Sequence, residues 1–276
     1  MTRLLITGGS SYLGQHLVPK ALERYSCRYT FFNRDPLELP EGVWLDARNK
    51  GAVKELIHEW RPQVIFHTAG SNRSDDMENV ICSGAKNITD AAKGVGARLI
   101  HISSDVIFDG TQAPYRESDS PSPIHAYGRA KSEAERIVQD YENHVIIRTS
   151  LIYGLTTMDL STEWIISTLR SGERITLFRD QIRNPVWVET LSSACLELCE
   201  SEYTGILNVA GRQAMSRADL GLKMLNWWGI EERDNLQIGL SDSRWPADCR
   251  LDLSFSARLL STPLLGVDEV LDEARG

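Results

Sequence analysis

Short apolar runs alternate with stretches of helical pattern through the first half of this 276-residue chain. A strand, a helix and a second strand in that order form a right-handed crossover, which makes the two strands parallel. Helices then cover both faces of the sheet, so the alternation predicts an α/β fold with a Rossmann-like, doubly wound parallel sheet. We predict strands at residues 3–7, 28–32, 63–67, 97–103 and 144–149, and helices near 12–24, 51–60, 76–94 and 123–141.

A glycine-rich loop follows the first predicted strand. Gly8 allows a tight turn there, and Gly14 allows the next helix to pack closely on the strand. The amino-terminal end of that helix offers free N–H groups and a positive dipole to a pyrophosphate. Ser11 stands where the GxxGxxG pattern has its middle glycine, and we expect its hydroxyl to hydrogen-bond phosphate. The segment therefore predicts a dinucleotide site at Gly8, Ser10, Ser11, Tyr12, Leu13 and Gly14.

The end of the second strand bears on the choice of dinucleotide. In dinucleotide-binding folds this position meets the adenosine ribose, where an acid favours a free 2′-hydroxyl and an arginine suits a 2′-phosphate. Asn33 and Arg34 stand here and favour NADP, whereas Asp35 leaves NAD open. Further along the chain, directly after Leu45, Asp46 and Ala47 could meet the adenine. Ordinary surface charge is the alternative for Arg34 and Asp46.

Tyr127 and Lys131 are spaced to share one face of a helix. Ser122 followed by Pro123 predicts the start of that helix, because serine is a common N-cap and proline a common first helical residue. A lysine ammonium one turn away favours the phenolate, so we expect Lys131 to lower the pKa of Tyr127. Ser104 could then orient a substrate carbonyl. The combination indicates proton transfer to an oxygen while hydride moves at its carbon, with chance spacing as the alternative.

The second half of the chain is less regular. Helical patterns occur near residues 160–171, 188–201, 216–226 and 254–261, with short extended pieces at 175–178 and 206–209. We expect residues 1–150 to form an NAD(P)-binding domain. Residues 151–276 would form a smaller, mixed substrate-binding region that can interleave with it.

Composition excludes several classes of function. A net charge of −8 and the lack of any long basic run argue against a nucleic-acid partner. No apolar stretch approaches the length of a membrane span. The chain enters its first strand without a charged leader or a cleavage site, so we expect a cytoplasmic protein.

The cysteines and two histidines are expected to be structural. The five cysteines are an odd number, and Cys195 and Cys199, one helical turn apart, have no second ligand pair. We therefore predict reduced, buried thiols and no metal site. His67 and His101 lie in apolar strands, where we expect core histidines with satisfied hydrogen bonds.

Taken together, these motifs resemble the extended short-chain dehydrogenase/reductases, and among them the dTDP-4-dehydrorhamnose reductases and their relatives. The resemblance runs almost from end to end. It rests on residues 6–8, 99–105, 108–110, 115, 117, 121, 127–131, 147–151, 153–154, 183–185, 205–211 and 244–248.

The resemblance implies a role for each matching residue. Ser104 would take the catalytic Ser/Thr position, Tyr127 would act as the acid, and Lys131 would tune Tyr127 and contact the ribose. Such an enzyme reduces a nucleotide-linked 4-keto-6-deoxysugar with NADPH. The cofactor would also meet Thr68, Ala69, Gly70 and Ser103. The substrate would meet Ser104, Asp105, Val106, Arg183, Arg244 and Trp245.

Two departures from the family pattern leave alternatives open. The family commonly has an aromatic residue where this chain has Val106, which bears on the choice of sugar. Asp105 is not followed by Glu, which weakens a dehydratase reading. Three alternatives to this reductase therefore stay open. They are an NAD-dependent epimerase, a reductase of a small carbonyl, and a non-catalytic subunit resembling the regulatory subunit of methionine adenosyltransferase. Exposed helices could support a homodimer.

Overall fold

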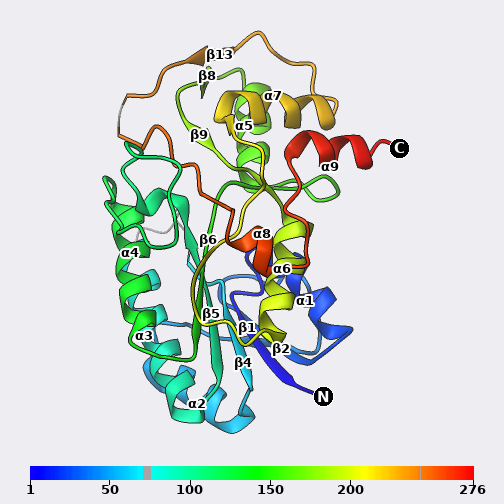
Figure 1. The fold of residues 1–276 in the computed structure, drawn as a ribbon. Helices are drawn as coiled ribbons and strands as arrows, with labels where there is room; N and C mark the ends of the chain where they lie inside the picture. Colours follow the sequence, from blue (N-terminus) through cyan, green and yellow to red (C-terminus); the bar gives the residue numbers. More distant parts are fainter. Residues whose placement is uncertain (71–75, 243) are drawn as a thin grey trace.

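A parallel sheet forms the body of the molecule, and a smaller lobe lies beyond the carboxyl ends of its strands (Figure 1). The computed structural model describes residues 1–70, 76–242 and 244–276. Its largest sheet has seven strands in the order β11-β6-β5-β4-β1-β2-β3, all paired in parallel. The strands are β1 (Arg3–Thr7), β2 (Ser26–Phe31), β3 (Gly42–Trp44), β4 (Val64–His67), β5 (Arg98–Ser104), β6 (His144–Thr149) and β11 (Gly205–Asn208). The predicted fold class is confirmed.

Helices cover both faces of this sheet because successive strand residues point to opposite sides. Leu4 and Ile6 face a core shared with α1 and α6, whereas Leu5 faces the core under α2, α3 and α4. All these strand residues are completely buried. The helices are α1 (Tyr12–Leu22), α2 (Lys50–Trp60), α3 (Met77–Val95), α4 (Ala126–Gln139) and α6 (Val188–Glu200).

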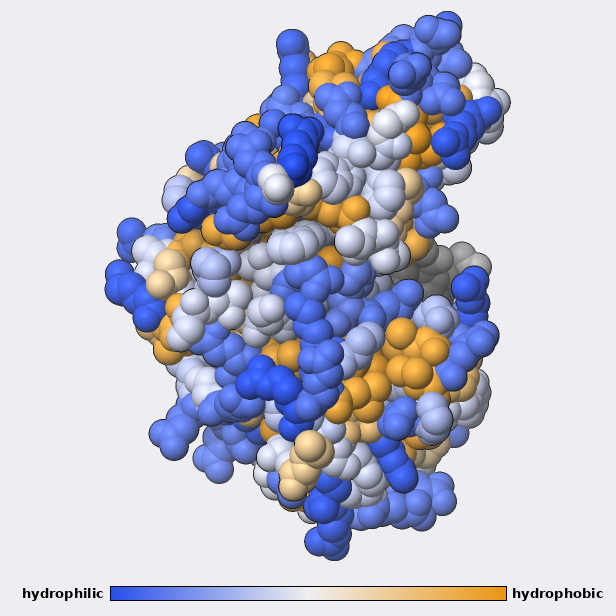
Figure 2. Space-filling view, turned by 90° about the vertical axis from the view of Figure 1, so that its right-hand side faces the viewer, coloured by the Kyte–Doolittle hydropathy of each residue, from blue (hydrophilic) through white to orange (hydrophobic). Residues whose placement is uncertain are grey.

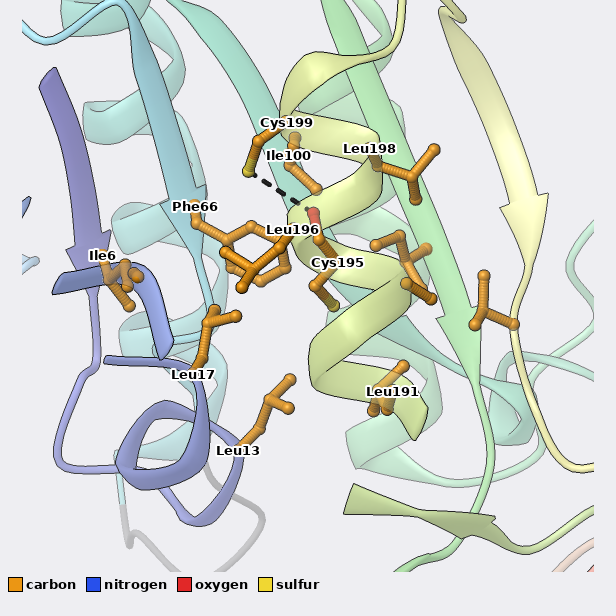
Figure 3. Close-up of a cluster of buried hydrophobic side chains, with 14 of the residues drawn as sticks. Ile6, Leu13, Leu17, Phe66, Ile100, Leu191, Cys195, Leu196, Leu198 and Cys199 are labelled. Atoms are coloured by element: carbon orange, nitrogen blue, oxygen red, sulfur yellow. Dashed lines mark hydrogen bonds between the residues drawn. The ribbon is translucent and has the colours of Figure 1, made fainter. Parts of the chain in front are cut away.

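Cys195 and Cys199 lie on the inner face of α6 and pack against the sheet (Figure 3). The Cys199 thiol donates a hydrogen bond to the Cys195 carbonyl at 3.4 Å. All five cysteines are free, and all but the half-buried Cys82 are buried. The two thiols of α6 therefore serve as small core residues.

The smaller lobe is built from the second half of the chain. α5 (Leu160–Arg170) and α7 (Arg217–Trp227) pack on a parallel pair of strands, β8 (Ile175–Phe178) and β13 (Leu236–Gly239). This lobe forms the upper part of Figure 2, where hydrophilic residues surround separate hydrophobic patches. The remaining elements are η1 (Asp105–Ile107), β7 (Ile152–Tyr153), β9 (Ile182–Arg183), β10 (Val186–Trp187), β12 (Met215–Ser216), α8 (Ser256–Leu259) and α9 (Val267–Glu273).

The two halves of the chain interleave. β11 pairs with β6 at the edge of the main sheet, and α6 packs against α1. Both elements come after residue 150, so part of the second half completes the body. Apart from elements of two or three residues, β13 and α9 are the described elements without a counterpart among the predicted ones.

The predicted start of α4 is wrong. The helix begins at Ala126, and the His125 side chain caps it by accepting a hydrogen bond from the Gly128 amide at 3.1 Å. Ser122 instead accepts from the Asp109 amide at 3.1 Å, so its hydroxyl closes the preceding loop. The sequence predicted Ser122 as the N-cap of α4, but its side chain makes a contact with the loop instead.

Candidate active site

The predicted site residues gather where the central strands of the sheet end. Gly8 follows β1, Thr68 follows β4, Ser104 ends β5 and Ser150 follows β6. Parallel strands present their carboxyl ends at one edge, which is where open α/β sheets bind ligands. The smaller lobe closes against this edge, since Tyr12 at the start of α1 donates to the Thr157 carbonyl at 2.7 Å.

The glycine loop holds the backbone close to its neighbours. Gly8 has φ of +80°, and a Cβ there would lie 2.7 Å from the Ala69 amide nitrogen. A Cβ on Gly14 would lie 2.5 Å from the Gly8 carbonyl oxygen. Glycine is therefore required at both positions, and the loop fits the close backbone approach that a dinucleotide pyrophosphate needs.

The Ser11 hydroxyl is used differently from the expected phosphate contact. It accepts from the Gly14 amide at 3.0 Å, as the N-cap of α1, and lies 2.9 Å from the Thr68 hydroxyl. Thr68 in turn donates to carbonyls of the loop, at 2.9 Å for Gly8. The side chain of Ser11 thus stabilises the loop, while the first-turn amides of α1, which lack intrahelical acceptors, remain suited to phosphate.

The residues predicted to meet the ribose and the adenine lie just after β2 and β3. Asn33 and Arg34 are exposed at the end of β2. Asp46 accepts from the Arg48 guanidinium at 2.9 Å, and these hydrogen bonds lower its pKa. The Arg48 guanidinium also lies 5.4 Å from the centre of the Phe32 ring. Asp46 is therefore already paired, and its predicted adenine contact stays a prediction.

Ser104 belongs to a polar cluster with Asp105 and Ser150. Asp105 is 2% exposed. Its carboxylate accepts from Ser150 Oγ at 2.6 Å and from Ser104 Oγ at 3.3 Å. Burial raises the Asp105 pKa, and the positive Arg183 opposes that rise. The carboxylate therefore orients the hydroxyl predicted to bind the substrate carbonyl.

Helix α4 docks its first turn on the segment after Ser104. A Cβ on Gly128 would lie 2.3 Å from the Val106 carbonyl oxygen, so only glycine permits this approach. One turn later, the Lys131 ammonium donates to the Ile102 carbonyl of β5. Tyr127 lies between these two anchors, and its charge responds to Asp105. The structure thus brings Ser104, Tyr127 and Lys131 to one place.

The expected direction of the Tyr127 pKa is wrong for the protein alone. Burial, followed by the negative charge of Asp105, raises the pKa of Tyr127 to about 12. Burial lowers the pKa of Lys131 to about 8. Loss of water on burial is the largest cause of both shifts, and the spacing of two residues along a helix does not reveal burial.

Lys131 makes stability depend on pH. Its folded pKa of about 8 is below the ordinary 10.5, so between these values the unfolded chain holds a proton that the folded chain lacks. The free energy of unfolding should therefore rise with pH in this window, by at most about 1.4 kcal/mol per pH unit. Urea unfolding of wild type and Lys131→Met at pH 8, 9 and 10 should show the difference growing in favour of wild type. Lys86→Met, at an exposed site on α3, should show a flat difference. A flat difference for Lys131→Met would contradict the lowered pKa.

Trp245 reaches the site, but Arg244 does not. The Trp245 ring centre lies 4.2 Å from that of His125, whose ring is parallel to Tyr127 at 6.3 Å. The three rings therefore form a row from Trp245 through His125 to Tyr127. The Arg244 side chain is 82% exposed and pairs with Asp242.

Arg183 is placed differently from the prediction. It is 2% exposed, and its guanidinium donates to the carbonyls of Ile182 at 2.7 Å, Ala247 at 2.8 Å and Pro246 at 2.8 Å. Its Nε lies 3.6 Å from Asp105 Oδ2. These hydrogen bonds join Pro246 and Ala247 to the site. A pyrophosphate could accept from the Arg183 guanidinium only if these hydrogen bonds were broken first.

The expectation of satisfied core histidines is wrong for His101 and, within the described part of the chain, holds for only one of the two ring nitrogens of His67. Both His67 and His101 are 1% exposed, with ring centres 5.2 Å apart. His67 Nδ1 lies 2.6 Å from Thr7 Oγ1. Neither nitrogen of His101 has a partner within the described ranges 1–70, 76–242 and 244–276. Burial and then the positive Lys131 lower the pKa of both, so they are neutral.

Three residues near the site were missed by the sequence reasoning: His125, Gln181 and Arg217. His125 adjoins a predicted motif, so a wider window would have included it. Gln181 and Arg217 come from the smaller lobe, and nothing local marks them.

Within the described residues, no group of three His, Cys, Asp or Glu side chains is placed to hold a metal ion. No helix of that part of the chain has the length and apolar character needed to cross a membrane.

Comparisons with known proteins agree with this geometry. A family model, the RmlD substrate binding domain, matches residues 1–248. Methionine adenosyltransferase 2 subunit beta of Xenopus tropicalis is 31% identical over 252 residues, which cover 83% of this chain and 72% of the relative.

Among solved structures, a hypothetical dTDP-4-dehydrorhamnose reductase from Sulfolobus tokodaii superposes with a TM-score of 0.82 at 29% identity, covering 97% of this chain and 98% of that one. The dTDP-4-dehydrorhamnose reductase of Bacillus anthracis, solved in complex with NADP, has a TM-score of 0.81 at 24% identity, with 99% and 97% covered.

Proposed function

Because the chain belongs to the family of the RmlD substrate binding domain, we propose that it is an NADPH-dependent reductase of a nucleotide-linked 4-keto-6-deoxysugar. The observation that supports this most is that Ser104, Tyr127 and Lys131 gather at the same edge of the sheet as the glycine loop. A protein that only bound the cofactor would not need all three.

Each residue has a distinct part in this proposal. Ser104, whose hydroxyl donates to Asp105 in the free protein, turns its single proton from that carboxylate to the ketone oxygen when the substrate binds. Tyr127 delivers a proton to that oxygen, and a pKa of about 12 keeps the phenol protonated until charge develops there. Lys131, one helical turn after Tyr127 and anchored on the Ile102 carbonyl, contacts the cofactor ribose. The bound nicotinamide supplies the hydride.

NADP is the proposed cofactor, with NAD still open. The NADP complex of the Bacillus anthracis reductase supports the choice, as does Arg34 at the end of β2. The glycine loop, where a Cβ at Gly8 or Gly14 would collide with the backbone, fits a dinucleotide.

The direct test is NADPH oxidation by the wild-type protein with dTDP-4-dehydrorhamnose, followed by the loss of NADPH absorbance. Stoichiometric loss of NADPH and formation of a reduced sugar are expected. An epimerase would convert the sugar without net consumption of added NADPH, and that result would exclude the reductase.

Arg34 should determine the preference for NADPH. Arg34→Ala is expected to raise the NADPH dissociation constant about tenfold and to leave that of NADH unchanged, since a charge-assisted bond to the 2′-phosphate is lost. Fluorescence titration with both cofactors measures this. Arg28→Ala, at an exposed position within β2, should alter neither constant. Equal weakening of both cofactors by Arg34→Ala would contradict the assignment.

A second candidate is a non-catalytic regulatory subunit, and the 31% identity to methionine adenosyltransferase 2 subunit beta favours it. This candidate predicts that the wild-type protein binds NADPH but oxidises none with any of a panel of keto-sugar nucleotides. It also predicts a stable complex with a methionine adenosyltransferase catalytic subunit in size-exclusion chromatography.

A further inference from the structure

A short two-stranded ribbon in the smaller lobe turns one face toward the active site. β9 pairs antiparallel with β12, and just beyond this pair the Arg217 amide donates to the Gln181 carbonyl at 2.9 Å. Alternate residues of a strand point to one side, and directly opposed residues are neighbours. Gln181, Arg183 and Arg217 therefore share a face. Because Arg183 on this face lies 3.6 Å from Asp105, the face is the one turned toward the cluster of Ser104, Asp105 and Ser150.

This face carries more positive than negative charge. Arg183 and Arg217 are both permanently charged, and Asp105 is the carboxylate that opposes them. Burial and the nearby Arg183 lower the Arg217 pKa, whereas Asp105 raises it. Two guanidiniums against one carboxylate leave at least one positive charge without a counter-charge, which is costly in a half-buried site.

Arg217 and Gln181 also have hydrogen-bonding capacity to spare. Arg217 Nη1 lies 3.4 Å from Gln181 Oε1, and no further hydrogen bond joins that guanidinium to the part of the chain that the structure describes. Gln181 is 1% exposed, yet its Nε2 has no partner in the same described part. A buried amide donor normally has a hydrogen-bond acceptor, so an unpaired one beside a guanidinium indicates that a bound ligand supplies the acceptor.

We propose that Arg217 and Gln181 bind the diphosphate of the sugar-nucleotide substrate. A diphosphate supplies both the negative charge and the acceptor oxygens that this face lacks, and a guanidinium binds such oxygens in pairs. The ribbon would thereby hold the nucleotide end while Ser104 and Tyr127 hold the ketone. This inference rests on the proposed function, because it assigns the diphosphate to the reductase substrate.

Calorimetric titration of the NADPH-loaded protein tests the site with inorganic pyrophosphate, dTDP and thymidine. Arg217→Met should weaken dTDP and pyrophosphate binding about tenfold or more, through loss of charge-assisted hydrogen bonds, and leave thymidine unchanged. Arg217→Lys should restore part of the loss. Arg212→Met, which removes an exposed arginine paired with Glu269, should bind dTDP as wild type does. Unchanged dTDP binding by Arg217→Met would overturn the proposal.

Gln181→Glu separates binding from a merely structural role. The new carboxylate would pair with the arginines inside the protein, so the thermal midpoint should hold or rise while dTDP and pyrophosphate binding disappear. Gln181→Leu should keep part of the binding, because the charge of Arg217 remains. Should Gln181→Glu bind dTDP as tightly as wild type, the site would be elsewhere. This variant also keeps the test decisive if Arg217→Met does not fold.

The outcomes for the site and for the reductase are distinct. Turnover of a keto-sugar nucleotide combined with unchanged dTDP binding by both variants would overturn the diphosphate site alone. Arginine-dependent dTDP binding with no reduction of any keto-sugar nucleotide would support the diphosphate site and count against the reductase.

Discussion

Replacement of Tyr127 by phenylalanine should lower the rate of NADPH oxidation by about 10²- to 10⁴-fold, the usual contribution of a positioned general acid. The change removes one oxygen from a half-buried ring and leaves the aromatic row with His125 in place. Because the helix remains anchored through Lys131 and the close approach of Gly128 to Val106, the site should keep its shape. The NADPH dissociation constant should therefore change little.

The measurement compares kcat and the NADPH dissociation constant for wild type and Tyr127→Phe, with Tyr141→Phe as the matched control. The Tyr141 hydroxyl donates to the Ala97 carbonyl at 2.9 Å, away from the site, so that variant should lose only a little stability. If Tyr127→Phe kept most of the activity and Asp105→Asn abolished it, the proton would come from Asp105, the carboxyl whose pKa burial raises.

Much of the fold could be predicted because its signals are local. Each central strand is a short apolar run buried on both faces, and the helices between them show their periodicity within a dozen residues. β13 was missed because Leu236–Gly239 is only partly buried and pairs with β8, some sixty residues earlier. α9 has only seven residues, too few for a clear periodicity.

The site was predictable as far as its motifs reach and no further. Ser104, Tyr127 and Lys131 could be found from spacing and resemblance. The Asp105 cluster could not, because Ser150 and Arg183 reach it from 45 and 78 positions later in the chain. Spacing also gave the wrong direction for the Tyr127 pKa, since burial depends on the whole packed structure. Likewise the ribbon that pairs Gln181 with Arg217 forms only in the folded lobe.

A third residue continues the face of α4 that carries Tyr127 and Lys131, since Glu135 follows at the same interval. Glu135 accepts from Arg148 of β6 at 3.1 and 2.9 Å, and both side chains are 1% exposed. Arg148 also donates to the Glu117 carbonyl at 3.1 Å. The pair therefore fastens the helix to the sheet and to the loop beside the site.

Glu135→Gln should lower the free energy of unfolding by about 3–5 kcal/mol, because it leaves the Arg148 charge buried without its partner. Urea unfolding at neutral pH measures the loss. Glu133→Gln, two residues away on the same helix, breaks an exposed pair with Arg136 and should cost no more than about 1 kcal/mol. Equal losses for the two variants would show that the buried pair contributes nothing beyond a surface contact.

The double variant Glu135→Leu/Arg148→Met decides what kind of contribution the buried pair makes. Apolar side chains of similar volume avoid the cost of burying two charges, so the double variant should recover most of the stability that Glu135→Gln loses. The kcat of the double variant should stay below that of wild type, because the methionine cannot donate to the Glu117 carbonyl as Arg148 Nη1 does. Recovery of stability without recovery of kcat would assign the pair to the geometry of the site. If the double variant had the stability and the kcat of wild type, the Glu135–Arg148 pair would contribute only packing.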